Sequence, residues 1–358
     1  MKIVFALLAL LSAFCCRAQH AENMVVITFD GLRWQEVFNG ADDSLLGNRV
    51  YVHDTAAMRK MFWAPTPEQR REKLLPFFWS VIAQNGQLHG NREYGSKVNV
   101  LNNYWFSYPG YNEMFTGNPD STVNSNDKIP NRFTNVLEYL HTLPGYKQRV
   151  AAFSSWDCFD AILNETRAGF PVSSGFDSVA TAATPRKQLL DEMQRNAPLT
   201  VGEGIRPDFF TYYQAREYVQ AYKPRVLYIA FDETDDYAHE GKYDHYLYAA
   251  RKTDEWIAAL WNMLQQMPEY KGKTGLLILC DHGRGDRVKA DWKHHGRKIE
   301  GADEIWLAAM GPGIAPRGEI KTPEQLYQAG LAKTLALLLG ERFEPRHRAE
   351  TDFLKALR

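Results

Sequence analysis

The chain has few cysteines and no excess of charge of either sign. Only 4 of its 358 residues are Cys, and their spacing does not resemble a cysteine-rich metal module. Lys and Arg number 42 against 43 Asp and Glu, so no general electrostatic attraction to a nucleic-acid polymer is expected. With 45% hydrophobic and 24% charged residues, the composition is that of a globular protein, which excludes a disordered chain, a collagen-like chain and a coiled coil.

Internal repeats, low-complexity tracts and linkers rich in Pro, Gly and Ser are also missing. The length allows one large α/β domain or two smaller ones. Because no composition shift marks a boundary, residues 19–358 are predicted to form a single domain with loop insertions.

Residues 1–18 have the pattern of a secretory signal peptide. An apolar run follows Lys2, and Cys16-Arg17-Ala18 places small residues at positions −3 and −1 of a cleavage site before Gln19. The run is too short for a stable membrane span, and a lipid anchor is disfavoured because Cys15 does not follow a small residue. The sequence therefore predicts a periplasmic or secreted protein of bacterial type, without a membrane anchor.

Cleavage there leaves two cysteines, Cys158 and Cys280. In an exported protein these two residues could form a disulfide. Cys280 also ends an apolar strand pattern, which is typical of a buried thiol. Both alternatives remain open from the sequence.

Short apolar runs alternate with helical patterns along the chain. The runs have the pattern of fully buried strands and lie at residues 24–29, 149–153, 226–231, 275–280 and 305–310. Helices are predicted at residues 67–84, 134–143, 207–222, 243–267 and 323–339, several with Pro near their start. This alternation predicts an α/β fold with a largely parallel central sheet and helices on both faces.

Acidic residues directly follow three of the predicted strands. Asp30 follows the first, residues 232–235 (Asp-Glu-Thr-Asp) follow the third, and Asp281-His282 follow the fourth. In open α/β sheets the ligand site lies beyond the carboxyl ends of the strands, so these side chains are expected at one edge. Each acidic residue taken alone is more simply a helix cap or a turn residue.

Histidines complete a candidate metal-ligand set. His239 follows Asp235 by four positions, which places both side chains on one face of a helical turn. His295 lies in a His-His-Gly segment further along the chain. Each histidine alone is usually a solvated surface residue, but together the nitrogen and oxygen donors suit zinc or a similar divalent ion.

A candidate nucleophile, Ser107, begins the segment Ser-Tyr-Pro-Gly-Tyr. The proline two residues later predicts a helix start, which puts the serine near the positive end of the helix dipole. A hydroxyl there is either a nucleophile activated by that charge or simply the helix N-cap.

In order along the chain, these motifs resemble those of the alkaline phosphatase superfamily. They are Phe-Asp-Gly at 29–31, Ser-Tyr-Pro-Gly-Tyr at 107–111 with Thr-Gly at 116–117, Glu-x-Asp-x-x-x-His at 233–239, Asp-His-Gly at 281–283 and His-Gly at 295–296. The branch they most resemble is the type I phosphodiesterase/nucleotide pyrophosphatase group, over about residues 24 to 315. The resemblance implies an alkaline-phosphatase-like fold and two divalent metal ions, zinc by preference.

The family's roles carry over residue by residue. Asp235, His239 and His295 match the ligands of one metal. The other metal's ligands are matched by Asp30, Asp281 and His282, and Ser107 matches the nucleophile that also binds that ion.

Two positions depart from the usual pattern of this branch. The nucleophile segment often reads Thr-Phe-Pro-Asn, so Ser107 keeps the hydroxyl while Gly110 stands where Asn is usual. The family's transition-state asparagine matches either Asn126 or Asn124, and Asn126 is the predicted catalytic residue.

The resemblance implies an exported two-metal hydrolase of small phosphoric esters that acts through a covalent phosphoserine. Three ligand carboxylates and two divalent ions leave about one positive charge, which a phosphodiester monoanion balances. Monoesterase branches carry a Lys-Asp-Arg-Gly-like segment where this chain has Trp156 and Cys158 in place of the cations. Both observations favour a phosphodiesterase, although Arg33, Lys128 or Arg167 could supply a cation from elsewhere.

Three alternatives remain open. One is a phosphomonoesterase. A sulfatase on the same scaffold is disfavoured because Ser-x-Pro-x-Arg would be needed and residue 111 is Tyr. The third is a catalytically silent metal- or glycan-binding relative. The sequence indicates neither the natural substrate nor the oligomeric state.

Overall fold

The computed structural model describes residues 20–177, 184–198, 201–202, 204–346 and 353–358. The predicted signal peptide lies outside these residues, together with Cys15 and Cys16. Within the described part of the chain, no helix combines the length and the apolar character that crossing a membrane requires.

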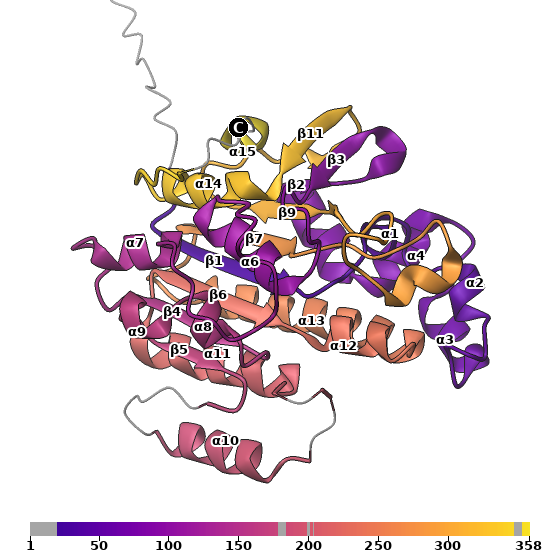
Figure 1. Ribbon diagram of the computed structural model, residues 1–358, viewed down its shortest axis with the longest axis horizontal. Coiled ribbons are helices and arrows are strands. Elements are labelled where there is room, and N and C mark those ends of the chain that lie inside the picture. The colour runs from indigo at the N-terminus through magenta and orange to yellow at the C-terminus, as the bar shows by residue number, and fades with distance from the viewer. Residues whose placement is uncertain (1–19, 178–183, 199–200, 203, 347–352) are drawn as a thin grey trace, which may run out of the picture.

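An eight-stranded sheet forms the centre of the molecule (Figure 1). In spatial order its strands are β10 (Gly318–Glu319), β2 (Gly86–His89), β9 (Leu307–Met310), β7 (Thr274–Cys280), β1 (Asn23–Phe29), β6 (Val226–Phe231), β4 (Val150–Ser154) and β5 (Val172–Ser174). β9 runs antiparallel to β2 and β7, whereas the other neighbouring pairs are parallel. The predicted largely parallel sheet is confirmed.

All five predicted strands contribute to this sheet, and four of them agree with it to within one residue at each end. The fifth, predicted at 305–310, is divided by Trp306. This side chain is fully buried, and its Nε1 donates a hydrogen bond to the carbonyl of Leu32. The two residues before it form β8 (Glu304–Ile305), which joins β3 (Ser96–Asn99) and β11 (Glu324–Tyr327) in a second, three-stranded sheet.

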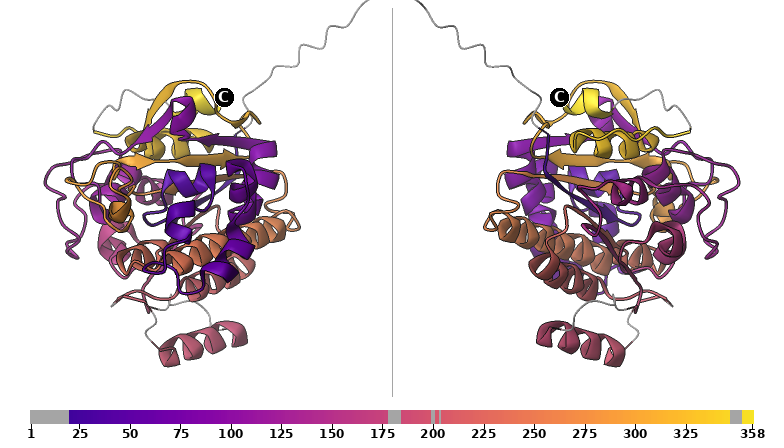
Figure 2. Two further views of the ribbon diagram at one scale, coloured as in Figure 1. Left: turned by 90° about the vertical axis from the view of Figure 1, so that its right-hand side faces the viewer. Right: turned by 90° about the vertical axis from the view of Figure 1, so that its left-hand side faces the viewer.

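Helices cover both faces of the central sheet, and one further helix lies outside these two layers. They are α1 (Trp34–Asn39), α2 (Asp43–Leu46), α3 (Thr55–Phe62), α4 (Pro67–Leu74), α5 (Ala83–Asn85), α6 (Ser107–Thr116), α7 (Val136–Thr142), α8 (Phe159–Ile162), α9 (Glu165–Ala168), α10 (Pro185–Asn196), α11 (Asp208–Tyr222), α12 (Glu233–His239), α13 (Tyr243–Leu264), α14 (Leu331–Leu338) and α15 (Phe353–Leu357). Helices α11 and α13 cover one face of the sheet, and α6, α7 and α14 pack together on the other. Figure 2 shows α10 outside these layers, where it contacts α11.

Two predicted helices differ from the observed ones. The helix predicted at 67–84 is interrupted after α4, because Pro76 cannot continue a helical hydrogen-bond ladder. The chain resumes as a π-helical turn (Phe78–Ile82), whose entry is fixed by the Asp254 carboxylate, an acceptor for the N–H groups of Phe77 and Phe78. The helix predicted at 323–339 was wrong over its first half, where β11 pairs with β3 before α14 begins.

Cys158 and Cys280 are both free thiols. Each is buried, Cys158 on the loop after β4 and Cys280 as the last residue of β7. The disulfide left open by the sequence is therefore not present, and the buried-thiol alternative holds for both residues.

Candidate active site

The sheet register brings the predicted strand-end residues together. Phe29 pairs with Phe231 on one side and with Cys280 on the other. The residues that follow these three partners, Asp30, Asp232 and Asp281, therefore leave the sheet side by side at its carboxyl edge. This is the position at which ligands bind in open α/β sheets.

Asp30, Asp281 and His282 form a buried group with the arrangement of metal ligands. His282 Nε2 lies 3.2 Å from Asp30 Oδ1 and 3.5 Å from Asp281 Oδ2. Both carboxylate oxygens are buried, and apart from these ion-pair contacts with His282 they form no hydrogen bond with any described residue. A buried carboxylate oxygen that lacks a hydrogen bond raises the free energy of the folded protein. A cation bound at this position would therefore stabilise the group.

The other polar atoms of these three residues are held by the protein. Tyr111 donates its hydroxyl to Asp30 Oδ2 (2.9 Å), and the Gly31 N–H donates to Asp281 Oδ1 (3.1 Å). His282 Nδ1 lies 3.0 Å from the Gly283 carbonyl, so Nε2 is the ring nitrogen left for a metal. Such contacts orient metal ligands and fix the histidine tautomer.

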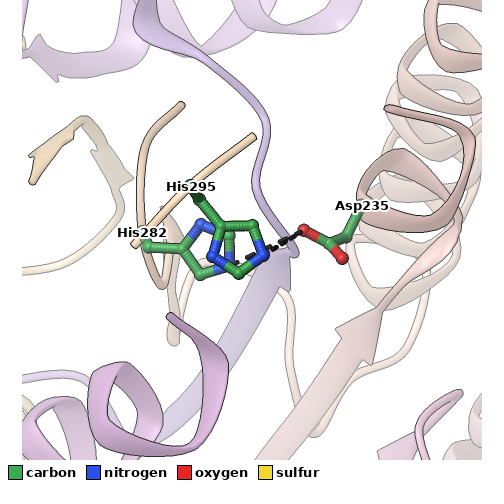
Figure 3. Close-up of side chains that lie close together, drawn as sticks. All are labelled: Asp235, His282 and His295. Atoms are coloured by element: carbon green, nitrogen blue, oxygen red, sulfur yellow. Dashed lines mark ion pairs between the residues drawn. The ribbon is translucent and has the colours of Figure 1, made fainter. Parts of the chain in front are cut away.

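A second group lies beside the first, and Figure 3 shows two of its residues, Asp235 and His295, together with His282 of the first group. Asp235 and His239 lie one turn apart on α12, with 3.0 Å between Asp235 Oδ2 and His239 Nε2. His295 Nε2 lies 2.9 Å from His239 Nε2 and 3.8 Å from Asp235 Oδ1. Figure 3 shows His282 and His295 pointing toward Asp235, and His282 thereby contacts both groups. The structure thus brings all six predicted ligand residues to one place.

Protonation differs between the histidines of the two groups. Burial and the nearby His282 lower the pKa of His239, and burial lowers that of His295 well below its usual value. Burial alone would lower the pKa of His282 as well, but the Asp281 and Asp30 carboxylates outweigh it and raise that pKa to about 9. His239 and His295 are therefore neutral at pH 7, which is the form that binds metals.

Ser107 is the first residue of α6 and lies against the first group. The N-cap residue is Phe106, so Ser107 is not the N-cap that the sequence left as its alternative role. Its Oγ lies 3.4 Å from His282 Nε2, and the residue is only 6% exposed. The helix approaches closely here, because a Cβ at Gly110 would lie 2.5 Å from the Asp281 carbonyl oxygen.

The two candidate asparagines occupy different positions. Asn126 accepts a hydrogen bond from the N–H of Tyr108 (3.0 Å), the residue after Ser107. Asn124 instead lines a cavity of about 200 Å³ that is formed by residues of the 122–132 segment together with Tyr108. Only Asn126 is thus placed at the start of the nucleophile helix by a hydrogen bond.

The three cationic residues that the sequence suggested as partners for a substrate phosphate are all paired with carboxylates of the protein. Arg33 is buried in an ion pair with Glu36, Lys128 Nζ lies 2.5 Å from Asp157 Oδ2, and Arg167 Nε lies 2.8 Å from Glu138 Oε1. Sequence reasoning missed a fourth, Arg284, which bonds to Asp235. Burial lowers the pKa of Arg284 to about 9, which still leaves it charged at pH 7.

Sequence reasoning also missed Tyr111, whose hydroxyl holds Asp30. The sequence did indicate that Tyr111 lies near the site, because it is four positions after Ser107 and so shares a helix face with it. Arg284 also had a signal, since it directly follows Asp281-His282-Gly283.

No protein-family model and no curated protein matches the sequence. Solved structures do match the fold. A protein in the alkaline phosphatase superfamily from Vibrio parahaemolyticus is 12% identical with a TM-score of 0.50, covering 90% of this chain and 67% of that one. The murine ectonucleotide pyrophosphatase/phosphodiesterase 5, in complex with AMP, is 12% identical with a TM-score of 0.55, covering 94% and 100%.

A 2-O GAG sulfatase is also similar, at 15% identity and a TM-score of 0.56, with 94% of this chain and 74% of that one covered. The phosphodiesterase and the sulfatase share a fold although their names specify different ester groups. The chain therefore has the fold of the alkaline phosphatase superfamily.

Proposed function

We propose that the protein is an exported phosphodiesterase that uses Ser107 as its nucleophile and two divalent ions, zinc by preference. The observation that carries this proposal is the position of Ser107 Oγ, 3.4 Å from His282 Nε2 at the start of α6. There the helix dipole and the adjacent ligand groups converge on one hydroxyl.

Asp30, Asp281 and His282 would hold one ion, and Asp235, His239 and His295 the other. When bound, such ions supply positive charge that polarises the phosphate and favours the ionised form of the serine hydroxyl. Asp30 Oδ1 and Asp281 Oδ2, which are buried and form no hydrogen bond beyond their ion-pair contacts with His282, support this assignment.

The reaction is a double displacement at phosphorus. Ser107 Oγ forms a bond to phosphorus while the bond to the first alcohol breaks, and that alcohol leaves with a proton. Water then hydrolyses the phosphoserine, which returns the serine hydroxyl and releases a phosphate monoester. Asn126 Oδ1 accepts a hydrogen bond from the Tyr108 N–H, which supports its amide nitrogen as the donor to a phosphate oxygen.

The charges around the site favour a diester over a monoester. A monoester dianion needs an added cationic donor, but Arg33, Lys128 and Arg167 are each paired with a carboxylate. Arg284 adds a charge that the sequence analysis did not count, yet its nitrogens donate to Asp235 and to the carbonyls of Gly31 and Lys293.

A sulfatase role is supported less well. The position at which a sulfatase segment requires Arg holds Tyr111, whose hydroxyl is bonded to Asp30. The predicted signal peptide at residues 1–18 supports export to the periplasm or the medium, where the substrate would be a small phosphate ester.

The test is a Ser107→Ala variant assayed with bis-p-nitrophenyl phosphate, p-nitrophenyl phosphate and p-nitrophenyl sulfate. We expect wild type to prefer the diester, and the variant to lose about a thousandfold or more in kcat while retaining zinc. Ser80→Ala, at an exposed position on the π-helical turn, is the matched control and should keep full activity. Full activity in Ser107→Ala would refute the nucleophile, and turnover of the sulfate ester alone would refute the phosphodiesterase.

A further inference from the structure

We propose that Arg284 is the positioning residue of the Asp235–His239–His295 site: its guanidinium holds one carboxylate oxygen of Asp235 and leaves the other for the metal. This inference rests on the proposed two-metal site. It assigns a function to a cation that none of the sequence motifs includes.

Arg284 connects three segments that carry candidate metal ligands. Its Nη2 donates to Asp235 Oδ1 and, at 3.2 Å, to the Asp235 carbonyl at the start of α12. Its Nε donates to the Gly31 carbonyl after β1 (3.0 Å), and its Nη1 donates to the Lys293 carbonyl (2.8 Å), two residues before His295. The residue is 1% exposed, so its guanidinium is shielded from water.

The contact leaves the two oxygens of Asp235 in different positions. Oδ1 is bonded to Arg284 and lies 3.6 Å from His282 Nε2 and 3.8 Å from His295 Nε2. Oδ2, which the arginine does not hold, lies 3.0 Å from His239 Nε2. Without the arginine the carboxylate could rotate about its χ angles. A metal would then have to order Asp235 itself, which weakens binding.

Gly31 provides an independent observation for this arrangement. A Cβ at this position would lie 2.7 Å from Arg284 Nε and 2.8 Å from Asp235 Oδ1. The backbone there also has a φ of +57°, which favours glycine. The first strand-end loop is thus shaped to admit the arginine–carboxylate pair directly over its backbone.

Arg284 does not orient the side chains of the other proposed metal site. Asp30, Asp281 and His282 are oriented by the Tyr111 hydroxyl, the Gly31 N–H and the Gly283 carbonyl. Removal of the guanidinium should therefore affect one metal site and spare the other. A general loss of folding would affect both.

The experiment measures zinc binding to the purified full chain by competition with a chromophoric chelator, together with metal content after dialysis. We expect two zinc ions per chain in wild type. In Arg284→Met we expect one ion at unchanged affinity and a second that binds about 10–100-fold more weakly. Arg284→Lys, which keeps the charge but not the forked donor geometry, should be intermediate.

Arg287→Met is the matched control, because this arginine lies in the same loop with its side chain 75% exposed, paired only with Glu300 among the described contacts. It should bind both ions as wild type does. If Arg284→Met folds poorly, a double-mutant cycle with Arg284→Lys and Asp235→Ala replaces it. Because the arginine acts through Asp235, the double variant should bind zinc as weakly as Asp235→Ala alone.

Unchanged affinity at both sites in Arg284→Met would overturn the inference, as would an equal loss at both sites or full additivity in the cycle. A wild-type chain that binds no zinc would instead refute the proposed two-metal function, so the two failures are distinguishable.

Discussion

Asp281 and His282 are the residues whose protonation depends most directly on whether an ion is present. Burial and the neighbouring Asp30 carboxylate raise the pKa of Asp281 to about 8, and the carboxylates raise that of His282 to about 9. Without an ion, both residues therefore hold a proton at pH 7. A metal ligand must be an ionised carboxylate or a neutral imidazole, so an ion has to displace these protons.

Zinc affinity should consequently rise with pH between about 6 and 9 and level off above that range. Both pKa values are raised, so the ion-free site binds both protons below about pH 8 and loses the second near pH 9. Each proton that is still bound contributes about tenfold in affinity per pH unit. Calorimetric titration in two buffers of different ionisation enthalpy counts the released protons. His53→Asn, at an exposed position, should leave the profile unchanged. A pH-independent affinity would contradict the proposed ligands.

Gly110 shows how a single residue departs from the family pattern for a steric reason. The Asn that is usual there would place a Cβ 2.5 Å from the Asp281 carbonyl oxygen. In this chain α6 packs directly on the loop after β7, and the missing side chain allows that approach. The sequence showed the departure, but only the packing explains it.

At the scale of elements, α12 is positioned through its first turn. Asp208, the first residue of α11, accepts hydrogen bonds from the N–H groups of Asp232 (2.9 Å) and Glu233 (3.1 Å) and from the Ser155 hydroxyl (2.5 Å). The N-terminus of α12 is thereby tied to the N-terminus of α11 and to the end of β4. Asp235 depends on this anchor for its place in the site.

Replacing Asp208 by Ala should lower the free energy of unfolding by at least about 2 kcal/mol, because buried N–H and hydroxyl donors lose their acceptor. Urea unfolding followed by circular dichroism measures the change. Asp43→Ala is the control, since its ion pair with Arg59 is exposed and should contribute less than about 1 kcal/mol. Equal stability of the two variants would show that Asp208 does not anchor α12.

At the scale of the whole molecule, the proposed metal sites join distant parts of the chain. Ser107 and His282 are 175 positions apart, and the ligands come from the loops after β1 and β7, from α12 and from the 294–296 segment. The unfolded chain does not hold these groups together. Zinc should therefore bind the folded state in preference and stabilise it.

We expect zinc to raise the melting temperature after treatment with EDTA. Each ion contributes about 2.7 kcal/mol when its free concentration is 100 times Kd, which corresponds to a shift of several degrees. Scanning calorimetry with and without zinc measures it. His239→Ala should show a smaller shift, because one proposed site loses a ligand. An unchanged melting temperature in wild type would contradict tight metal binding to the fold.

The sequence by itself determined the central strands and the chemical groups at their ends. Continuous apolar runs are a local property, so β1, β4, β6 and β7 could be located to within one residue, and Asp30 and Asp281 were visible directly after them. Motif order supplied Ser107, Asp235, His239 and His295, whose proposed roles await the experiments above.

Only the tertiary structure decided which of these groups meet and what holds them. It showed Asn126 bonded to the Tyr108 N–H, Phe106 rather than Ser107 as the N-cap of α6, and Arg284 bonded to Asp235. It also showed β9 running antiparallel and a strand where a helix was expected at 324–327. The physical reason is that these features depend on contacts between residues tens to hundreds of positions apart, which local apolar periodicity does not encode.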